Sequence, residues 1–214
     1  TALIPPGQNA AAESSKITEA EQELFIADHL QGLKAPAQLH YKIIRRGSLQ
    51  SELNDSAEVA LSAENGKTIS EVRFLSGSNE MKLPPIPGVK GNPILLHFLE
   101  REIREMSRLT GGSVNYYRKR VRMALAAEPV VKSVKILHAG KAVSAKQIRI
   151  SPYLNDPARS RYEKFATRAY EMVLSDQVPG GIVRLQGELY APNRARDETS
   201  LLWSETVSFE NHTE

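Results

Sequence analysis

The stretch that decides the fold is residues 92–109, which read NPILLHFLEREIREMSRL. Asn92 is a good N-cap, and Pro93 suits the first position of a helix, where its missing N–H costs nothing. Apolar side chains then recur at the spacing of one helix face, namely Leu95, Phe98, Leu99, Ile103, Met106 and Leu109. The sequence therefore predicts an amphipathic helix that needs an apolar partner.

A second helix is predicted directly after the first. Gly111 and Gly112 end the first helix, and Ser113 can cap the next one. Residues 114–127, VNYYRKRVRMALAA, again place apolar side chains on one side. Two amphipathic helices joined by so short a turn form a helical hairpin with an apolar face to bury.

The segments on both sides of this hairpin show the period-two alternation of β-strands. Asn65-Gly66 favours a type I′ turn between two of them, because both central residues of that turn need positive φ. Thr18 and Glu21 form a capping-box pattern that predicts an N-terminal helix over residues 18–31. The predicted strands cover residues 37–46, 57–61, 68–75, 130–137, 142–150, 169–174, 182–190 and 201–209.

The order of these elements predicts an α+β fold. Most strands follow one another through turns, so we expect a curved, mainly antiparallel, half-barrel-like sheet packed against the helical hairpin and the N-terminal helix. Residues 17–214 are expected to form a single domain, since no repeat or strong break divides them. Residues 1–16, rich in Ala, Pro, Gln and Ser, are expected to be a flexible segment ahead of it.

Composition and motifs exclude several classes of function. The absence of cysteine excludes disulfides, thiolate metal sites and a cysteine nucleophile. The net charge of +3 is too small to indicate a nucleic-acid partner, and no apolar run is long enough to span a bilayer. The five histidines lack metal-ligand spacing, and no phosphate-binding loop or nucleophile elbow is present. We therefore expect a non-enzymatic protein with no catalytic residue, cofactor or metal.

Two candidate sites follow from the predicted helices. A cleft between a curved sheet and the hairpin would suit an acyl chain or an apolar peptide, and its expected lining is Leu95, Phe98, Leu99, Ile103 and Tyr117. The second candidate is a basic surface formed by Arg118, Lys119 and Arg122. The same cluster also fits a solvated helix face whose charge is offset by Glu100, Glu102 and Glu105 of the preceding helix.

The C-terminal half resembles bacterial exported proteins in three segments: AGKAV at 139–143, ISPY at 150–153 and YEMVLSDQVPGG at 170–181. Over residues 37–210 the order of hairpins, helices and closing strands is similar to the lipoprotein-carrier and lipoprotein-insertion proteins of the periplasm. Those proteins have an open, strongly curved antiparallel half-barrel with helices as a lid. The resemblance implies a periplasmic or otherwise exported protein, with its signal peptide removed, that holds an apolar ligand or partner.

Two hypotheses are preferred at this point, and nucleic-acid binding by the basic cluster is a third. The first is a non-catalytic periplasmic protein that binds a lipid, an acyl chain or an apolar protein segment in the cleft between sheet and helices. The second is an interaction or assembly module of the cell envelope, in which the helices fill the core and an outer face with Arg118 and Arg122 binds another protein.

Overall fold

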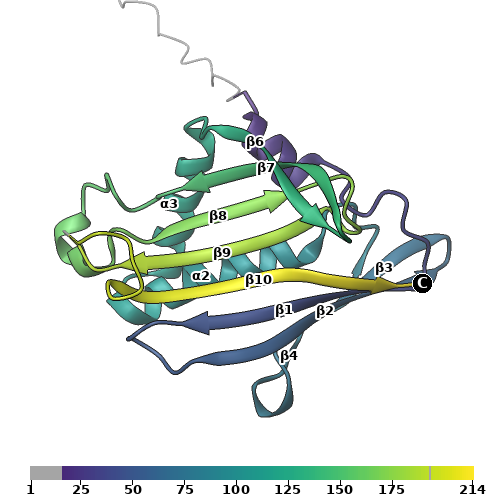
Figure 1. Ribbon diagram of the computed structural model, residues 1–214, viewed down its shortest axis with the longest axis horizontal. Coiled ribbons are helices and arrows are strands. Elements are labelled where there is room, and N and C mark those ends of the chain that lie inside the picture. Colours follow the sequence, from purple (N-terminus) through teal and green to yellow (C-terminus); the bar gives the residue numbers. More distant parts are fainter. Residues whose placement is uncertain (1–15, 193) are drawn as a thin grey trace, which may run out of the picture.

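The computed structural model describes residues 16–192 and 194–214, so the expected flexible segment at residues 1–16 lies outside the described residues except for Lys16. The chain forms one β-sheet with helices packed against one of its faces (Figure 1). The strands are β1 (Ala37–Arg46), β2 (Leu53–Glu64), β3 (Lys67–Phe74), β4 (Met81–Lys82), β5 (Ile86–Pro87), β6 (Val131–His138), β7 (Lys141–Ile150), β8 (Ala169–Leu174), β9 (Ile182–Tyr190) and β10 (Leu201–Thr213).

The helices are mostly gathered in two places along the chain. A short N-terminal turn, α1 (Glu19–Glu21), continues into a π-helix, η1 (Gln22–Ile26), and the long pair α2 (Pro93–Thr110) and α3 (Val114–Ala126) forms the hairpin. Three short 3₁₀ turns complete the set, namely η2 (Gly77–Asn79), η3 (Arg159–Arg161) and η4 (Glu163–Phe165).

All strand pairs of the sheet are antiparallel, and the sheet is open. The strand order is β4-β3-β2-β1-β10-β9-β8-β7-β6, with β5 also paired to β3. The first and last long strands, β1 and β10, are therefore neighbours in the middle of the sheet, as Figure 1 shows. The predicted α+β class, with a curved antiparallel sheet against a helical hairpin and an N-terminal helix, is confirmed.

The helical hairpin begins and ends where its capping residues predict. Asn92 Oδ1 accepts a hydrogen bond from the Ile94 N–H over 3.1 Å, Gly111 takes a φ of 73°, and Ser113 Oγ accepts from the Tyr116 N–H over 3.1 Å. The Asn92 amide also donates to Tyr41 Oη and to the Gly180 carbonyl, both over 2.7 Å. The start of α2 is thereby tied to β1 and to the turn between β8 and β9.

One face of the sheet packs on the hairpin and the other is polar. Along β1, Leu39, Tyr41 and Ile43 are fully buried, while the alternating residues His40 and Lys42 are partly exposed. From α2, the side chains that fill the space above the sheet are Ile94, Leu95, Phe98 and Met106, all exposed by 1% or less. Packing of this kind leaves one solvated sheet face, which is typical of antiparallel sheets.

Some of the predicted boundaries are wrong. The N-terminal helix does not reach residue 31: Ala27 turns to an extended ψ of 142°, and the Leu30 N–H bonds to the Lys90 carbonyl instead of continuing the helix. The strand predicted at 57–61 begins at Leu53, so that Asn54 and Asp55 pair with β1. The Asn65-Gly66 turn is confirmed, with φ of 50° and 74°.

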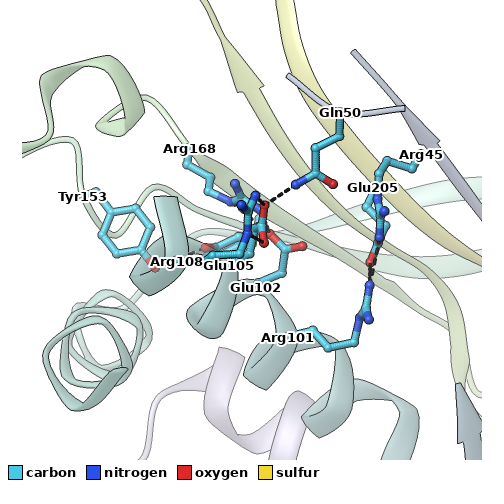
Figure 2. A network of polar contacts seen from close by, with 10 residues as sticks. Arg45, Gln50, Arg101, Glu102, Glu105, Arg108, Tyr153, Arg168 and Glu205 are labelled. Atoms are coloured by element: carbon cyan, nitrogen blue, oxygen red, sulfur yellow. Dashed lines mark hydrogen bonds and ion pairs between the residues drawn. The ribbon is translucent and has the colours of Figure 1, made fainter. Parts of the chain in front are cut away.

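A row of charged side chains crosses the buried layer between α2 and the sheet (Figure 2). Arg168 donates to Glu102 from Nε over 3.0 Å and from Nη2 over 2.7 Å, and its guanidinium lies 3.9 Å from the centre of the Trp203 ring. Glu205 of β10 accepts from Arg45 and Arg101. The expectation that Glu102 helps to offset the basic cluster of the second helix is therefore wrong, since Glu102 is only 1% exposed and pairs with Arg168.

Candidate functional site

A largely apolar hollow lies on the outer side of the helices, away from the sheet. It is a groove of about 830 Å³ bordered by α1, η1, α2 and α3. We refer to it as the helical groove. Its lining residues are Glu21, Phe25, Leu96, His97, Leu99, Glu100, Ile103, Arg118, Lys119, Val121, Arg122, Met123, Leu125 and Ala126.

Large apolar side chains of the helical groove are left facing solvent. Leu96 is 55% exposed, Met123 48% and Phe25 40%. These three residues come from three different helices, yet they border one concave surface. Covering these half-exposed side chains with an apolar partner would remove apolar surface from water, which is favourable by about 25 cal/mol per Å².

The rim of the helical groove is basic on the α3 side. Lys119 and Arg122 are exposed, and among the described residues neither has a carboxylate within 4.0 Å. The third basic residue, Arg118, is instead engaged by Glu100, with Nη2 2.8 Å from Oε1. The rim therefore keeps two positive charges that no described carboxylate neutralises.

The two acidic residues of the helical groove already accept hydrogen bonds from other groups of the protein. Glu100 also accepts from Arg104 over 3.0 Å, and Glu21 accepts from the Thr18 N–H over 2.9 Å as part of a capping box. The three basic residues of the lining, Arg118, Lys119 and Arg122, outnumber these two carboxylates, so the groove carries a net positive charge.

His97 adds a polar group to the floor of the groove. Its Nε2 is buried and has no hydrogen-bond partner among the described residues. Burial lowers the pKa of His97 below its ordinary value, so the ring is neutral at pH 7. A neutral imidazole can donate or accept a hydrogen bond at this nitrogen, depending on its tautomer.

The residues predicted to line a cleft between sheet and hairpin divide into three sets. Leu99 and Ile103 line the helical groove, although they are only 6% and 4% exposed. Leu95 and Phe98 face the sheet and are exposed by 1% and 0%. Tyr117 packs instead among Tyr116, Tyr153 and Tyr162, with ring centres 5.4 to 5.7 Å away.

All three predicted surface residues, Arg118, Lys119 and Arg122, border the helical groove. The sequence reasoning missed Phe25, Leu96, His97 and Met123, which complete it. A signal for Leu96 was present, because Leu96 is two residues from both Ile94 and Phe98 and therefore lies on the opposite side of the helix from them.

Within residues 16–192 and 194–214, no helix combines the length and apolar character needed to cross a bilayer. In the same residues, no three His, Asp or Glu side chains are grouped so that they could hold a metal ion.

Comparison with known proteins gives little further guidance. No protein-family model matches the chain, and no curated protein matches it significantly. Among solved structures, the lipoprotein LppX of Mycobacterium tuberculosis is similar over 91% of this chain and 93% of its own, with 12% sequence identity and a TM-score of 0.35. The resemblance predicted from sequence is therefore met as a weak structural similarity to a lipoprotein, and at this TM-score it carries no argument about function.

Proposed function

We propose that the protein is a non-catalytic periplasmic binding protein that holds an anionic amphiphile, such as a fatty acid, in the helical groove. The observation that carries this proposal is the pairing of an exposed apolar floor, built around Leu96 and Met123, with a rim at Lys119 and Arg122 that has no described carboxylate partner.

Size and shape support an elongated small ligand. The volume of about 830 Å³ lies within the range of about 300–1,000 Å³ that ligand pockets occupy. An acyl chain would cover Leu96, Met123 and Phe25, and its carboxylate would reach the basic rim. The proposed location in the periplasm is supported by the resemblance of residues 139–185 to exported proteins.

The groove replaces the cleft between sheet and hairpin as the proposed site. Leu95 and Phe98 already fill the space against the sheet, so a ligand there would have to displace packed side chains. A ligand in the helical groove needs no such rearrangement.

The test is a fluorescence titration of detergent-free protein with 11-(dansylamino)undecanoic acid. We expect saturable binding with one ligand per chain and displacement by laurate. Dodecyltrimethylammonium, whose chain is equally long but whose head group is positive, should displace the probe much less well. Absence of saturable binding, or equal displacement by both amphiphiles, would contradict the proposal.

An apolar protein segment is the other occupant that the groove could receive, as in an envelope assembly module. That outcome predicts a different result in the same assay. The dansyl acid would fail to bind, while an amphipathic helical peptide with acidic flanks would be retained on the immobilised protein.

A further inference from the structure

A second cavity, of about 660 Å³, lies on another face of α2 and shares no lining residue with the helical groove. Its walls come from β1, the loop that follows β1, β4, α2 and β10. Figure 2 shows the polar side chains gathered there. We refer to it as the arginine cavity, because Arg45, Arg101, Arg104 and Arg108 all line it.

The carboxylates of the arginine cavity are already neutralised. Glu205 is held by Arg45, with Nη2 2.5 Å from Oε2, and by Arg101 over 3.0 Å. Glu105 accepts from Arg108 over 2.6 Å and from Gln50. Each glutamate thus has its counter-charge inside the protein, and none is left to attract a cation.

The arginines exceed the glutamates around this cavity. Arg168 does not line the cavity but pairs with Glu102, which does, with Arg168 Nη2 2.7 Å from Glu102 Oε2. With Arg168 included, five guanidinium groups lie around three carboxylates. Arg104 also pairs with Glu100, which lies outside the cavity. Even with Glu100 counted, one positive charge remains in excess, and the cavity favours an anion.

Two buried N–H donors on residues that line the arginine cavity lack an acceptor among the described residues, namely Arg101 Nε and Trp203 Nε1. Behind them, Arg168 stacks on the Trp203 ring. Nearly all buried donors in native proteins are paired, and an unpaired one costs about 1–3 kcal/mol. Both groups are donors, so the missing partner is an acceptor.

We propose that the arginine cavity is a second binding site, for a small organic anion that presents carboxylate or phosphate oxygens to these donors. Leu49 and Met81 give the same cavity an apolar portion, which suits an organic ligand rather than a bare ion. This site is independent of the helical groove, because the two hollows have no lining residue in common.

Trp203 makes the proposal directly testable, because it is the only tryptophan of the chain. In a ¹H–¹⁵N correlation spectrum its indole N–H gives a single resonance. We would titrate labelled protein at about pH 7 with sodium phosphate and, separately, with sodium acetate, each against sodium chloride at equal ionic strength. We expect a saturable shift of the indole resonance with one of the two oxyanions, and the responding arm identifies the ligand as a phosphate or a carboxylate.

Two charge variants complete the experiment without disturbing the buried pairs. Ser51 is exposed at the wall of the arginine cavity, so Ser51→Glu should weaken oxyanion binding about fivefold. Ser133 is equally exposed but lies in β6, outside the cavity, so Ser133→Glu should leave binding unchanged. If neither oxyanion shifts the indole resonance beyond chloride, the donors bind only water and the proposal fails. Equal affinities in the two variants would also overturn it.

Discussion

Arg168 and Glu102 form an ion pair that is closed off from solvent, with Arg168 Nη2 2.7 Å from Glu102 Oε2 and side-chain exposures of 0% and 2%. The pair fastens α2 to the segment that precedes β8. Burying the Glu102 carboxylate this completely removes its hydration, and the attraction to Arg168 only partly offsets that free-energy cost.

The protonation of Glu102 should make stability depend on pH. Burial raises the pKa of Glu102 to about 7, although Arg168 opposes the shift. The folded protein then keeps a proton that the unfolded chain releases, so the unfolding free energy of the wild type falls as pH rises from about 4.5 to 7. Urea denaturation at about pH 5 should find Glu102→Gln close to the wild type, because Gln resembles a protonated Glu. At about pH 8 the variant should be more stable by roughly 2 kcal/mol.

Glu105 provides the matched control on the same helix. Burial opposes its charge, but the hydrogen bond and the charge of Arg108, together with the charges of Arg168 and Arg45, outweigh this effect and lower the pKa of Glu105. It is therefore ionised in both the folded and the unfolded state above about pH 6, and the difference between wild type and Glu105→Gln should stay constant up to pH 8. A difference between Glu102→Gln and the wild type that instead stays constant from about pH 5 to 8 would contradict this account and show that Glu102 is ionised throughout.

Gly187 of β9 should tolerate no side chain, because it lies directly beneath the same ion pair. A Cβ at this position would lie 2.5 Å from Glu102 Oε2 and 2.9 Å from Trp203 Cζ3. Gly187→Ala should lower the unfolding free energy by about 1–3 kcal/mol through overpacking. Gly91→Ala, where the nearest atom is 4.0 Å away, is the control and should change it little. Equal effects in the two variants would mean that the space beside Glu102 can adjust.

The apolar floor of the helical groove is tested by comparing two exposed leucines. Leu96 lies in the groove and is 55% exposed, whereas Leu137 is 77% exposed on β6, outside it. Leu96→Asp should weaken binding of the dansyl acid by about tenfold or more, because burial of one leucine is worth about 1.5–3 kcal/mol. Leu137→Asp should bind like the wild type. Equal loss in both variants would indicate nonspecific adsorption to exposed apolar residues.

The basic rim should make binding depend on salt. Arg122→Glu should weaken the dansyl acid about fivefold at low ionic strength, and the difference from the wild type should shrink as salt screens the rim. Lys132→Glu, on the exposed side of β6, is the control for net charge alone. Should Arg122→Glu and Lys132→Glu behave alike at every salt concentration, the head group would not lie at the α3 rim.

Local signals explain why the hairpin could be predicted from sequence. Asn92, Gly111 and Ser113 act on neighbouring backbone groups, so their role does not depend on the rest of the fold. The N-terminal helix was predicted too long because its end is set by the hydrogen bond from the Leu30 N–H to the Lys90 carbonyl. A contact between residues so distant in sequence leaves no local pattern.

In the sequence, the buried glutamates show only as interruptions of the apolar periodicity of a helix and a strand. Glu102 stands four residues from both Phe98 and Met106 on the apolar face of α2, and Glu205 alternates with Trp203 and Val207 in β10. Their partner arginines come from other elements, which the sequence does not place. The helical groove escaped prediction for the same reason, because it exists only where η1 meets the outer side of the hairpin.

The most direct test of the central claim uses the methyl groups of the four methionines as site-specific NMR reporters. Met123 lies in the helical groove, Met81 in the arginine cavity, and Met106 and Met172 in the core between helix and sheet. Titration of ¹³C-methyl-methionine protein with laurate should shift the Met123 resonance saturably and leave Met106 and Met172 in place. Movement of Met106 and Met172 without Met123 would put the ligand beneath the hairpin, and no saturable movement of any methionine would mean that the protein holds no such amphiphile.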